Sequence, residues 1–257
     1  MSLSYVVSGF AVGLLVGLTG VGGGSLMTPL LTLLFGISPT VAVGTDLAFA
    51  SFTKTAGTFA HRFRGTIHWE IVRRLCIGAL PAALAATLAL KYFGALDAHM
   101  GQVIRYSIAG SVLLTVIAIL FRARMQAWVQ RHPEKQLHGA RLSGATILAG
   151  AILGCLVTIS SIGAGAIGAT LLVLLYPQLK PAEIAGTDIA YAVPLTAIAA
   201  MGHWWLGSIN WELLGMLLLG SVPGITLGSL AAKAVPEKIL RALLAMTLTG
   251  VAAKLVF

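Results

Sequence analysis

Two glycine clusters, each in the middle of an apolar stretch, contain the residues best suited to binding a ligand. The first is Gly20-Val21-Gly22-Gly23-Gly24-Ser25, and the second, Ile162-Gly163-Ala164-Gly165-Ala166, follows Ser160 and Ser161. Glycine costs about 1 kcal/mol per residue in a helix interior, so each cluster predicts the end of one helix and the start of another. The free N–H groups and the positive dipole at the start of a helix bind anions. The clusters therefore predict an anion site at two broken helices.

The composition indicates the class of protein that holds these clusters. Hydrophobic residues make up 58% of the 257 positions and charged residues only 10%, and the mean hydropathy is +0.93. A soluble domain has about 25% charged residues. The apolar blocks are about 20 to 25 residues long, which matches a helix that crosses a hydrocarbon core of about 30 Å. We therefore predict an all-α polytopic membrane protein.

The charges and cysteines narrow the expected partners. The net charge of +9 is compatible with nucleic-acid binding, but the basic residues lie at the ends of the apolar blocks. A membrane-surface role explains that arrangement better, so the lipid bilayer is an expected partner and nucleic acid is not. Cys76 and Cys155 lie inside apolar blocks, which predicts small buried residues and neither a disulfide nor a metal site.

The apolar blocks predict where the helices lie. The block Leu3–Phe35 is too long for one crossing and is split by the first glycine cluster into a short helical pair. Further helices are predicted over 40–60, 71–93 and 103–121. The polar, basic stretch 122–141 is the predicted linker between two halves.

The second half repeats the first. Pro39 and Pro181 are 142 positions apart, and the same shift superimposes Gly44-Thr45-Asp46 on Gly186-Thr187-Asp188. A shift of 141 pairs Gly22-x-Gly24 with Gly163-x-Gly165. The chain is therefore a predicted tandem duplication, with one helical repeat over 1–121 and a second over 142–257.

Loop charge predicts that the two repeats have opposite orientations in the membrane. Four arginines, Arg62, Arg64, Arg73 and Arg74, flank the turn after the second block. The matching turn, His203–Trp211, contains no Lys or Arg, so equivalent turns are expected on opposite sides. With a cytoplasmic linker, each repeat then needs an odd number of crossings. We expect about five helices in each half, two of them short, and both chain termini outside.

Lys54 is an unusual ionisable residue because it lies inside an apolar block, as do Asp46 and Asp188. Asp46 and Lys54 are two helical turns apart, about 12 Å along the axis, which excludes a simple direct ion pair. A bound anion is one partner that would stabilise the Lys54 ammonium. Extension of the side chain toward the cytoplasmic interface is the alternative.

Each of the two aspartates follows a Gly-Thr pair, so Thr45 with Asp46 and Thr187 with Asp188 form equivalent sites. One interpretation is that the aspartates carry protons. The other is that each accepts hydrogen bonds from the free N–H groups of a neighbouring short helix and holds that helix in place. The sequence leaves both interpretations open.

The remaining polar residues do not indicate catalysis. His61 and His203 lie at helix ends, where anchoring at the membrane interface is expected rather than metal binding, because no second ligand lies at suitable spacing. Residues 22–25 lack the Gly-Lys-Ser/Thr ending of a phosphate-binding loop. We expect no catalytic residue, no metal and no cofactor. An intramembrane enzyme that uses Ser25 or Ser160 with His61 is the alternative of another class.

The motifs carry a resemblance to a known family. The stretches Gly17–Pro29 and Ala42–Asp46, repeated as Ser161–Gly165 and Gly186–Asp188, are similar to those of the TauE/SafE family of sulfite and organosulfonate exporters. The similarity covers nearly the whole chain. It implies a duplicated helical bundle in the bacterial inner membrane and, as substrates, small sulfur-containing anions such as sulfite or sulfoacetate. The second copy departs from the glycine-rich form at Ala164 and Ala166.

The expected function is a secondary transporter that exports such anions by alternating access, with coupling to the proton gradient. A passive channel for small oxyanions, or a transporter of another small carboxylate or oxyanion, is the alternative. The sequence leaves the formation of a homodimer open. The residues expected to contact substrate are Thr19, Gly22, Gly23, Gly24, Ser25, Lys54, Ser160, Ser161, Gly163 and Gly165.

Overall fold

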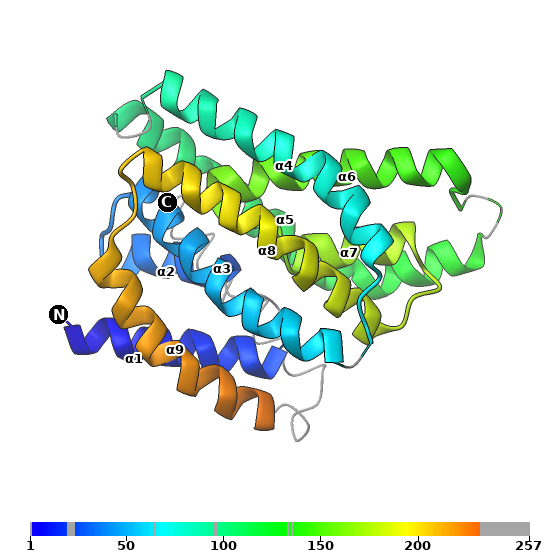
Figure 1. Ribbon diagram of the computed structural model, residues 1–257, viewed down its shortest axis with the longest axis horizontal. Coiled ribbons are helices and arrows are strands. Elements are labelled where there is room, and N and C mark those ends of the chain that lie inside the picture. The colour runs from blue at the N-terminus through cyan, green and yellow to red at the C-terminus, as the bar shows by residue number, and fades with distance from the viewer. Residues whose placement is uncertain are drawn as a thin grey trace.

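The computed structural model describes residues 2–19, 24–63, 65–94, 97–132, 134 and 136–231. Within these ranges the chain forms nine α-helices and no strand (Figure 1). They are α1 (Ser2–Thr19), α2 (Gly24–Leu34), α3 (Pro39–Phe63), α4 (Trp69–Tyr92), α5 (Ala98–Arg131), α6 (Gly139–Ser160), α7 (Ala166–Leu175), α8 (Pro181–Trp205) and α9 (Trp211–Ala231).

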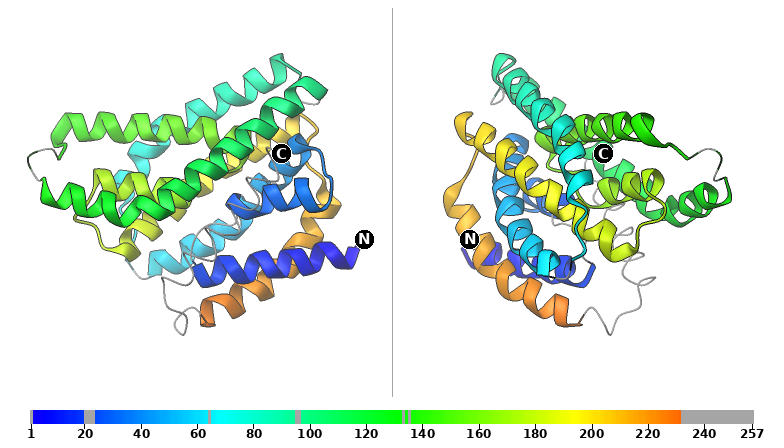
Figure 2. Two further views of the ribbon diagram at one scale, coloured as in Figure 1. Left: turned by 180° about the vertical axis from the view of Figure 1, so that it is seen from behind. Right: turned by 45° about the vertical axis from the view of Figure 1, so that its right-hand side comes forward.

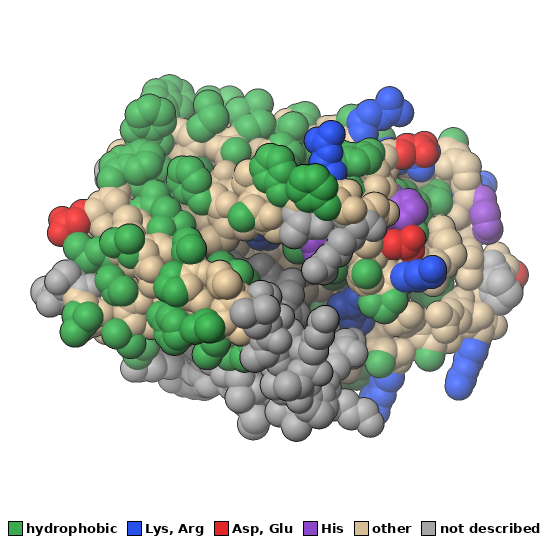
Figure 3. Space-filling model, turned by 60° about the horizontal axis from the view of Figure 1, so that its bottom comes forward, with side chains coloured by type: hydrophobic (Ala, Val, Ile, Leu, Met, Phe, Trp, Pro, Cys, Tyr) green, Lys and Arg blue, Asp and Glu red, His purple; other side chains and the backbone are tan. Residues whose placement is uncertain are grey.

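Five of the described helices are long and apolar enough to cross a membrane: α4, α5, α6, α8 and α9. Large apolar side chains are exposed on their outer faces, for example Leu148, Leu219 and Ile117. Figure 3 shows one face of the molecule, on which apolar side chains cover a wide area while most of the visible charged side chains gather toward one end. The predicted class, an all-α polytopic membrane protein, is confirmed.

The helix lengths correct one expectation about the broken pairs. The second helix of each broken pair is short, with 11 residues in α2 and 10 in α7. However, α6 has 22 residues and is long enough to span, so the prediction of two short helices in the second half is wrong. The reason is that the apolar run that begins at Gly139 contains only isolated glycines, with neither a proline nor a glycine cluster before the loop after Ser160.

The predicted linker also begins later than expected. Helix α5 continues for ten residues beyond Phe121 and ends at Arg131, because residues 122–131 contain neither Gly nor Pro. The tenth helix that the sequence predicts falls within residues 232–257, which lie outside the described part of the chain.

The helices of the two sequence halves are interleaved. Helix α9 packs along α1, and α4 packs along α6. Helices α3 and α8 run antiparallel through the middle of the molecule (Figures 1 and 2). In both figures the short helix α2 runs back against the direction of α1, and α7 runs back against α6.

Glycines allow the closest of these packings. A Cβ added at Gly13 of α1 would lie 2.6 Å from the Ser221 carbonyl oxygen of α9, and one added at Gly9 would lie 3.0 Å from the Leu217 Cα. The missing side chains of these two glycines therefore allow α1 and α9 to approach closely. On the other pair, Gly150 of α6 lies against the backbone of α4 in the same way. Each half of the sequence therefore contributes a helix that is held by the other half.

Candidate functional site

The second glycine cluster forms a loop between two helices, as predicted. Helix α6 ends at Ser160 and α7 begins at Ala166. Gly163 and Gly165 have φ angles of +140° and +131°, which L-residues with side chains rarely adopt. The Ile162 N–H donates a hydrogen bond to Ser160 Oγ (3.2 Å), so the serine helps to close the end of α6. The glycines are therefore required by the backbone of this break.

The first cluster lies in the sequence between the described helices α1 and α2. Helix α1 ends at Thr19 and α2 begins at Gly24. The predicted site residues Gly22 and Gly23, and the side chains of Thr19 and Ser25, lie outside the described residues. The structure therefore describes the second glycine cluster of the candidate site and the helices that flank both clusters.

Two backbone N–H groups near the start of α7 donate hydrogen bonds to carbonyl oxygens of the preceding loop. The Gly168 N–H donates to the Gly163 carbonyl oxygen (2.9 Å), and the Ala169 N–H donates to that of Gly165 (2.8 Å). Ala166 and Ile167 therefore carry the amides at the tip of the helix, where the dipole is positive.

Lys54 reaches from α3 to this second break. Its side chain is buried, and Nζ donates a hydrogen bond to the Ala164 carbonyl oxygen (3.1 Å). Extension toward the membrane interface, the alternative that the sequence left open, is wrong. An ammonium group has three donors, so two remain beyond this bond. Asp188 and Asp46 act electrostatically on the ammonium and stabilise its charge.

Asp46 connects α3 to the short helix α2. The carboxylate is fully buried, and its Oδ2 accepts a hydrogen bond of 2.5 Å from Thr28 Oγ1 of α2. Its Oδ1 has no hydrogen-bond partner among the described residues. The hydroxyl of Ser161 is within interaction range of this carboxylate and likewise has no hydrogen-bond partner in the described part of the chain. A residue of the second break thus lies beside the aspartate of the first repeat.

Asp188 occupies the corresponding place beside the short helix α7. Its Oδ1 and the hydroxyl of Tyr191 are both buried, and within the described ranges neither has a hydrogen-bond partner. A Cβ added at Gly168 would collide with Asp188 Oδ1 and lie 2.9 Å from the Tyr191 hydroxyl. The two oxygens therefore lie over the same glycine of the first turn of α7. Sequence reasoning missed Tyr191, although its place three residues after Asp188 on an apolar helix was a usable signal.

Thr45 and Thr187 each hold the start of a helix from the other half. The Asn210 N–H, just before α9, donates to Thr45 Oγ1 (3.1 Å), and the His68 N–H, just before α4, donates to Thr187 Oγ1 (3.1 Å). These two hydroxyls therefore fasten α3 to α9 and α8 to α4.

Comparison with known proteins decides what kind of molecule contains this arrangement. Residues 5–255 match the family described as Sulfite exporter TauE/SafE. The chain belongs to the TauE/SafE family. No solved structure matches it.

The relatives of this TauE/SafE chain are bacterial. It is 38% identical to the "Probable membrane transporter protein YjnA" of Bacillus subtilis over 229 residues, 89% of each chain. It is 27% identical to the "Probable membrane transporter protein YdhB" of the same organism over 241 residues, 93% of each chain. A "Probable membrane transporter protein" of Xylella fastidiosa (strain Temecula1) is 30% identical over 234 residues, 88% of this chain and 82% of the relative. The chain is a multi-pass protein of the bacterial inner membrane and a member of a family of membrane transporters.

The two histidines of this TauE/SafE chain differ in their surroundings. His61 is partly exposed, and its Nδ1 lies 2.9 Å from Thr66 Oγ1. His203 is fully buried, with Nδ1 at 2.8 Å from Ser208 Oγ and Nε2 at 2.9 Å from the Thr158 carbonyl oxygen. Interfacial anchoring is therefore wrong for His203. Because a carbonyl only accepts, Nε2 carries the proton, and the ring ties α8 to the end of α6.

Ser160 is bound to a helix that sequence reasoning did not connect with the site. Its hydroxyl donates to Ser111 Oγ of α5 (3.1 Å), and both side chains are buried. Ser111 lies in an apolar helix without a distinguishing motif, so no sequence signal pointed to it.

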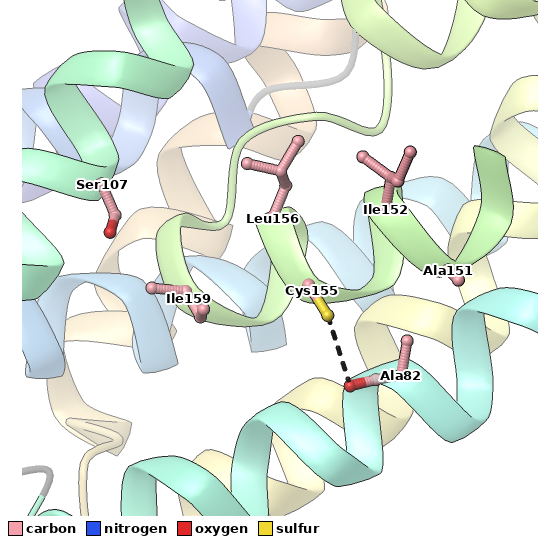
Figure 4. A pocket seen from close by; sticks show the side chains of 7 residues that line it. All are labelled: Ala82, Ser107, Ala151, Ile152, Cys155, Leu156 and Ile159. Atoms are coloured by element: carbon pink, nitrogen blue, oxygen red, sulfur yellow. Dashed lines mark hydrogen bonds between the residues drawn. The ribbon is translucent and has the colours of Figure 1, made fainter. Parts of the chain in front are cut away.

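A separate apolar cavity of about 420 Å³ lies between α4, α5 and α6 (Figure 4). Its lining residues are Ala82, Ser107, Ala151, Ile152, Cys155, Leu156 and Ile159. Cys155 is exposed at this cavity and donates to the Ala82 carbonyl oxygen (3.9 Å), so the expectation that it is buried is wrong. The cavity contains none of the residues predicted to contact substrate.

Proposed function

We propose that this protein is a secondary transporter that exports small sulfur-containing anions, such as sulfite or sulfoacetate-like organosulfonates, by alternating access coupled to the proton gradient. The observation that carries the proposal is the buried Lys54 ammonium bound to Ala164 in the loop of a broken helix. A buried cation beside the positive end of a helix is an arrangement that favours an anion. A sulfur oxyanion offers several acceptor oxygens to the amides and to the two further Lys54 donors.

The pairing of equivalent contacts supports an inverted repeat of five and five helices. Thr45 holds the start of α9 as Thr187 holds the start of α4. Likewise, α1 packs on α9 as α6 packs on α4. In each of these two pairs of contacts, the second contact is obtained from the first by exchanging the two repeats. Broken helices that meet from opposite orientations near the midplane build the substrate sites of many secondary transporters. The proposed site accordingly includes the predicted residues of both glycine clusters.

The family name supports the substrate class and the direction of transport. The test is uptake of radiolabelled sulfite, sulfoacetate, sulfate, taurine and acetate by proteoliposomes that contain the purified protein. We expect saturable uptake of sulfite or sulfoacetate, and accumulation against their own gradient when a pH gradient is imposed. Protein-free liposomes control for leakage.

Each other result of this experiment identifies an alternative. Flux that no pH gradient drives uphill would indicate a passive anion channel. Uptake of acetate without uptake of any sulfur anion would replace the substrate class by small carboxylates. Absence of all flux would contradict the proposal.

A further inference from the structure

The first observation is a pair of unsatisfied buried oxygens in the second repeat. Asp188 Oδ1 and the Tyr191 hydroxyl are both buried, lie together over Gly168, and have no hydrogen-bond partner among the described residues. Buried polar atoms without partners are rare in folded proteins because each loses its hydrogen bonds to water without a replacement. The two oxygens are neighbours that are not hydrogen-bonded to each other, so a proton bound by the carboxylate would allow a hydrogen bond that the structure lacks.

The equivalent aspartate of the first repeat has a different environment. Asp46 Oδ2 is held at 2.5 Å by Thr28, so that carboxylate already has a fixed donor that ties α2 to α3. The repeat shift of 141 pairs Thr28 with Ala169 of α7, which has no hydroxyl to donate, and Asp188 lies against Gly168. Asp46 and Asp188, which the sequence presents as equivalent, therefore differ in whether the neighbouring short helix offers a hydrogen-bond donor.

The charged groups around Asp188 come from several helices. Lys54 of α3 and Arg122 of α5 act on it electrostatically. Tyr191 of α8 lies beside it, and Cys76 of α4 acts on Tyr191. The described residues of α7 carry no charged group. Two buried carboxylates, Asp46 and Asp188, thus face one buried ammonium, Lys54, and an anion that enters adds a further negative charge.

We propose that Asp188 is the proton-carrying residue of this protein, that the Tyr191 hydroxyl is its hydrogen-bond partner, and that Asp46 keeps α2 in place without exchanging protons. In the ionised state Lys54 balances the carboxylate, and Asp188 Oδ1 and the Tyr191 hydroxyl are not hydrogen-bonded to each other, as in the structure. When a proton from water binds Asp188, the new carboxyl O–H donates to the Tyr191 oxygen, and the charge of Lys54 becomes available to an anion. Proton and anion therefore bind together.

The role in coupling rests on the proposed function, whereas the proton site itself does not. With one proton for each singly charged anion the transport step is electroneutral. The direction of net transport then follows the product of the anion and proton gradients, and export requires an outward anion gradient larger than the opposing proton gradient.

The test of the proton site needs no substrate. Infrared difference spectra of the purified protein in lipid, recorded between acidic and alkaline pH, report a protonated carboxylic acid directly. We expect a titrating carboxyl band in the wild-type protein that is lost in Asp188→Asn and kept in the matched variant Asp46→Asn. Tyr191→Phe should retain the band at a shifted frequency, because the hydrogen-bond partner of the acid is gone.

Three results of that experiment would overturn the inference. They are the absence of a titrating band, loss of the band in Asp46→Asn with retention in Asp188→Asn, and an unchanged band in Tyr191→Phe. Because Tyr191→Phe preserves volume and apolar packing, it decides the question even where Asp188→Asn fails to fold.

Binding of methanesulfonate, whose charge is constant across this pH range, then tests the coupling. Wild-type affinity should increase as the pH falls, by up to about tenfold per pH unit, the limit for one linked proton. Asp188→Asn should bind with an affinity that does not depend on pH, and Asp46→Asn should keep the dependence. A wild-type protein that does not bind methanesulfonate at any pH, but shows the expected infrared bands, contradicts the proposed function and leaves the proton site standing.

Discussion

At the scale of single residues, the arrangement depends on a few buried polar groups that the fold alone does not need. A buried ammonium in a membrane protein is costly, and here it is stabilised by one carbonyl oxygen and by two carboxylates in its surroundings. Apolar side chains of the same length would fill the space of Lys54 without that cost. The buried charge therefore supports the proposed anion site.

Replacement of Lys54 by Gln should weaken anion binding. The amide can still donate to Ala164, whereas the charge-assisted bond to the anion, about 1.5–3 kcal/mol, is lost. We expect the affinity for sulfite or methanesulfonate, measured by isothermal titration calorimetry, to fall by about 10- to 100-fold. Lys91→Gln is the control, because Lys91 lies over the ring of Trp205 at an exposed helix end. Equal affinities in the two variants would show that Lys54 does not contact the anion.

Thr28→Val should reduce stability through Asp46. The substitution keeps the shape of Thr28 but leaves a buried carboxylate oxygen without its donor, which costs about 1–3 kcal/mol. Thermal unfolding in detergent should show a lower midpoint for Thr28→Val and a midpoint close to that of the wild-type protein for Thr28→Ser, which keeps the hydroxyl. A Val variant as stable as the wild-type protein would mean that the bond does not hold α2 in place.

The sequence singled out Lys54, Asp46 and Asp188 correctly as unusual residues, but it could not say what they touch. Ala164 is 110 positions from Lys54, and a long flexible side chain gives no directional signal. Tyr191 and Ser111 were missed because Tyr and Ser are unremarkable inside a helix until the packing brings an aspartate or a broken helix beside them.

At the scale of helices, periodic apolar blocks located α3 and α4 to within a few residues. The ends of α5 and α6 were harder to predict. A basic sequence such as 122–131 is polar enough to resemble a linker, yet its residues are good helix formers. Polarity reports contact with water and does not by itself report the end of a helix.

Glycine packing between α6 and α4 provides a prediction with a control on the same helix. A Cβ at Gly150 would collide with the Leu75 carbonyl oxygen, whereas a Cβ at Gly144 would meet nothing within 4 Å. Gly150→Ala should destabilise the protein by about 1–3 kcal/mol because two backbones must separate. Gly144→Ala should be neutral or stabilising by up to about 1 kcal/mol through helix propensity. The unfolding midpoint in detergent should be below that of the wild-type protein for Gly150→Ala, and equal to it or above it for Gly144→Ala. A Gly150→Ala midpoint at or above that of Gly144→Ala would contradict the packing argument.

At the scale of the whole molecule, the duplication is visible in the sequence but the interleaving is not. A repeated sequence shows which segments are alike, but it does not show which segments are in contact. In the structure α1 of the first half is held by α9 of the second, and α4 is held by α6. Thr45 and Thr187 add one hydrogen bond across each of two further junctions. The units that move during transport are therefore expected to combine helices from both halves.

Interleaving predicts that neither half of the chain folds alone. If residues 1–132 and 136–257 are expressed as separate fluorescent fusions, each should aggregate in size-exclusion chromatography. The reason is that Gly9 and Gly13, or Gly150, then expose backbone surfaces that only the other half covers. Expression of both pieces together should restore a single monodisperse peak that contains both tags. A monodisperse peak from either piece alone would mean that each repeat is a folding unit, and that the contacts of α1 with α9 and of α4 with α6 form between finished domains.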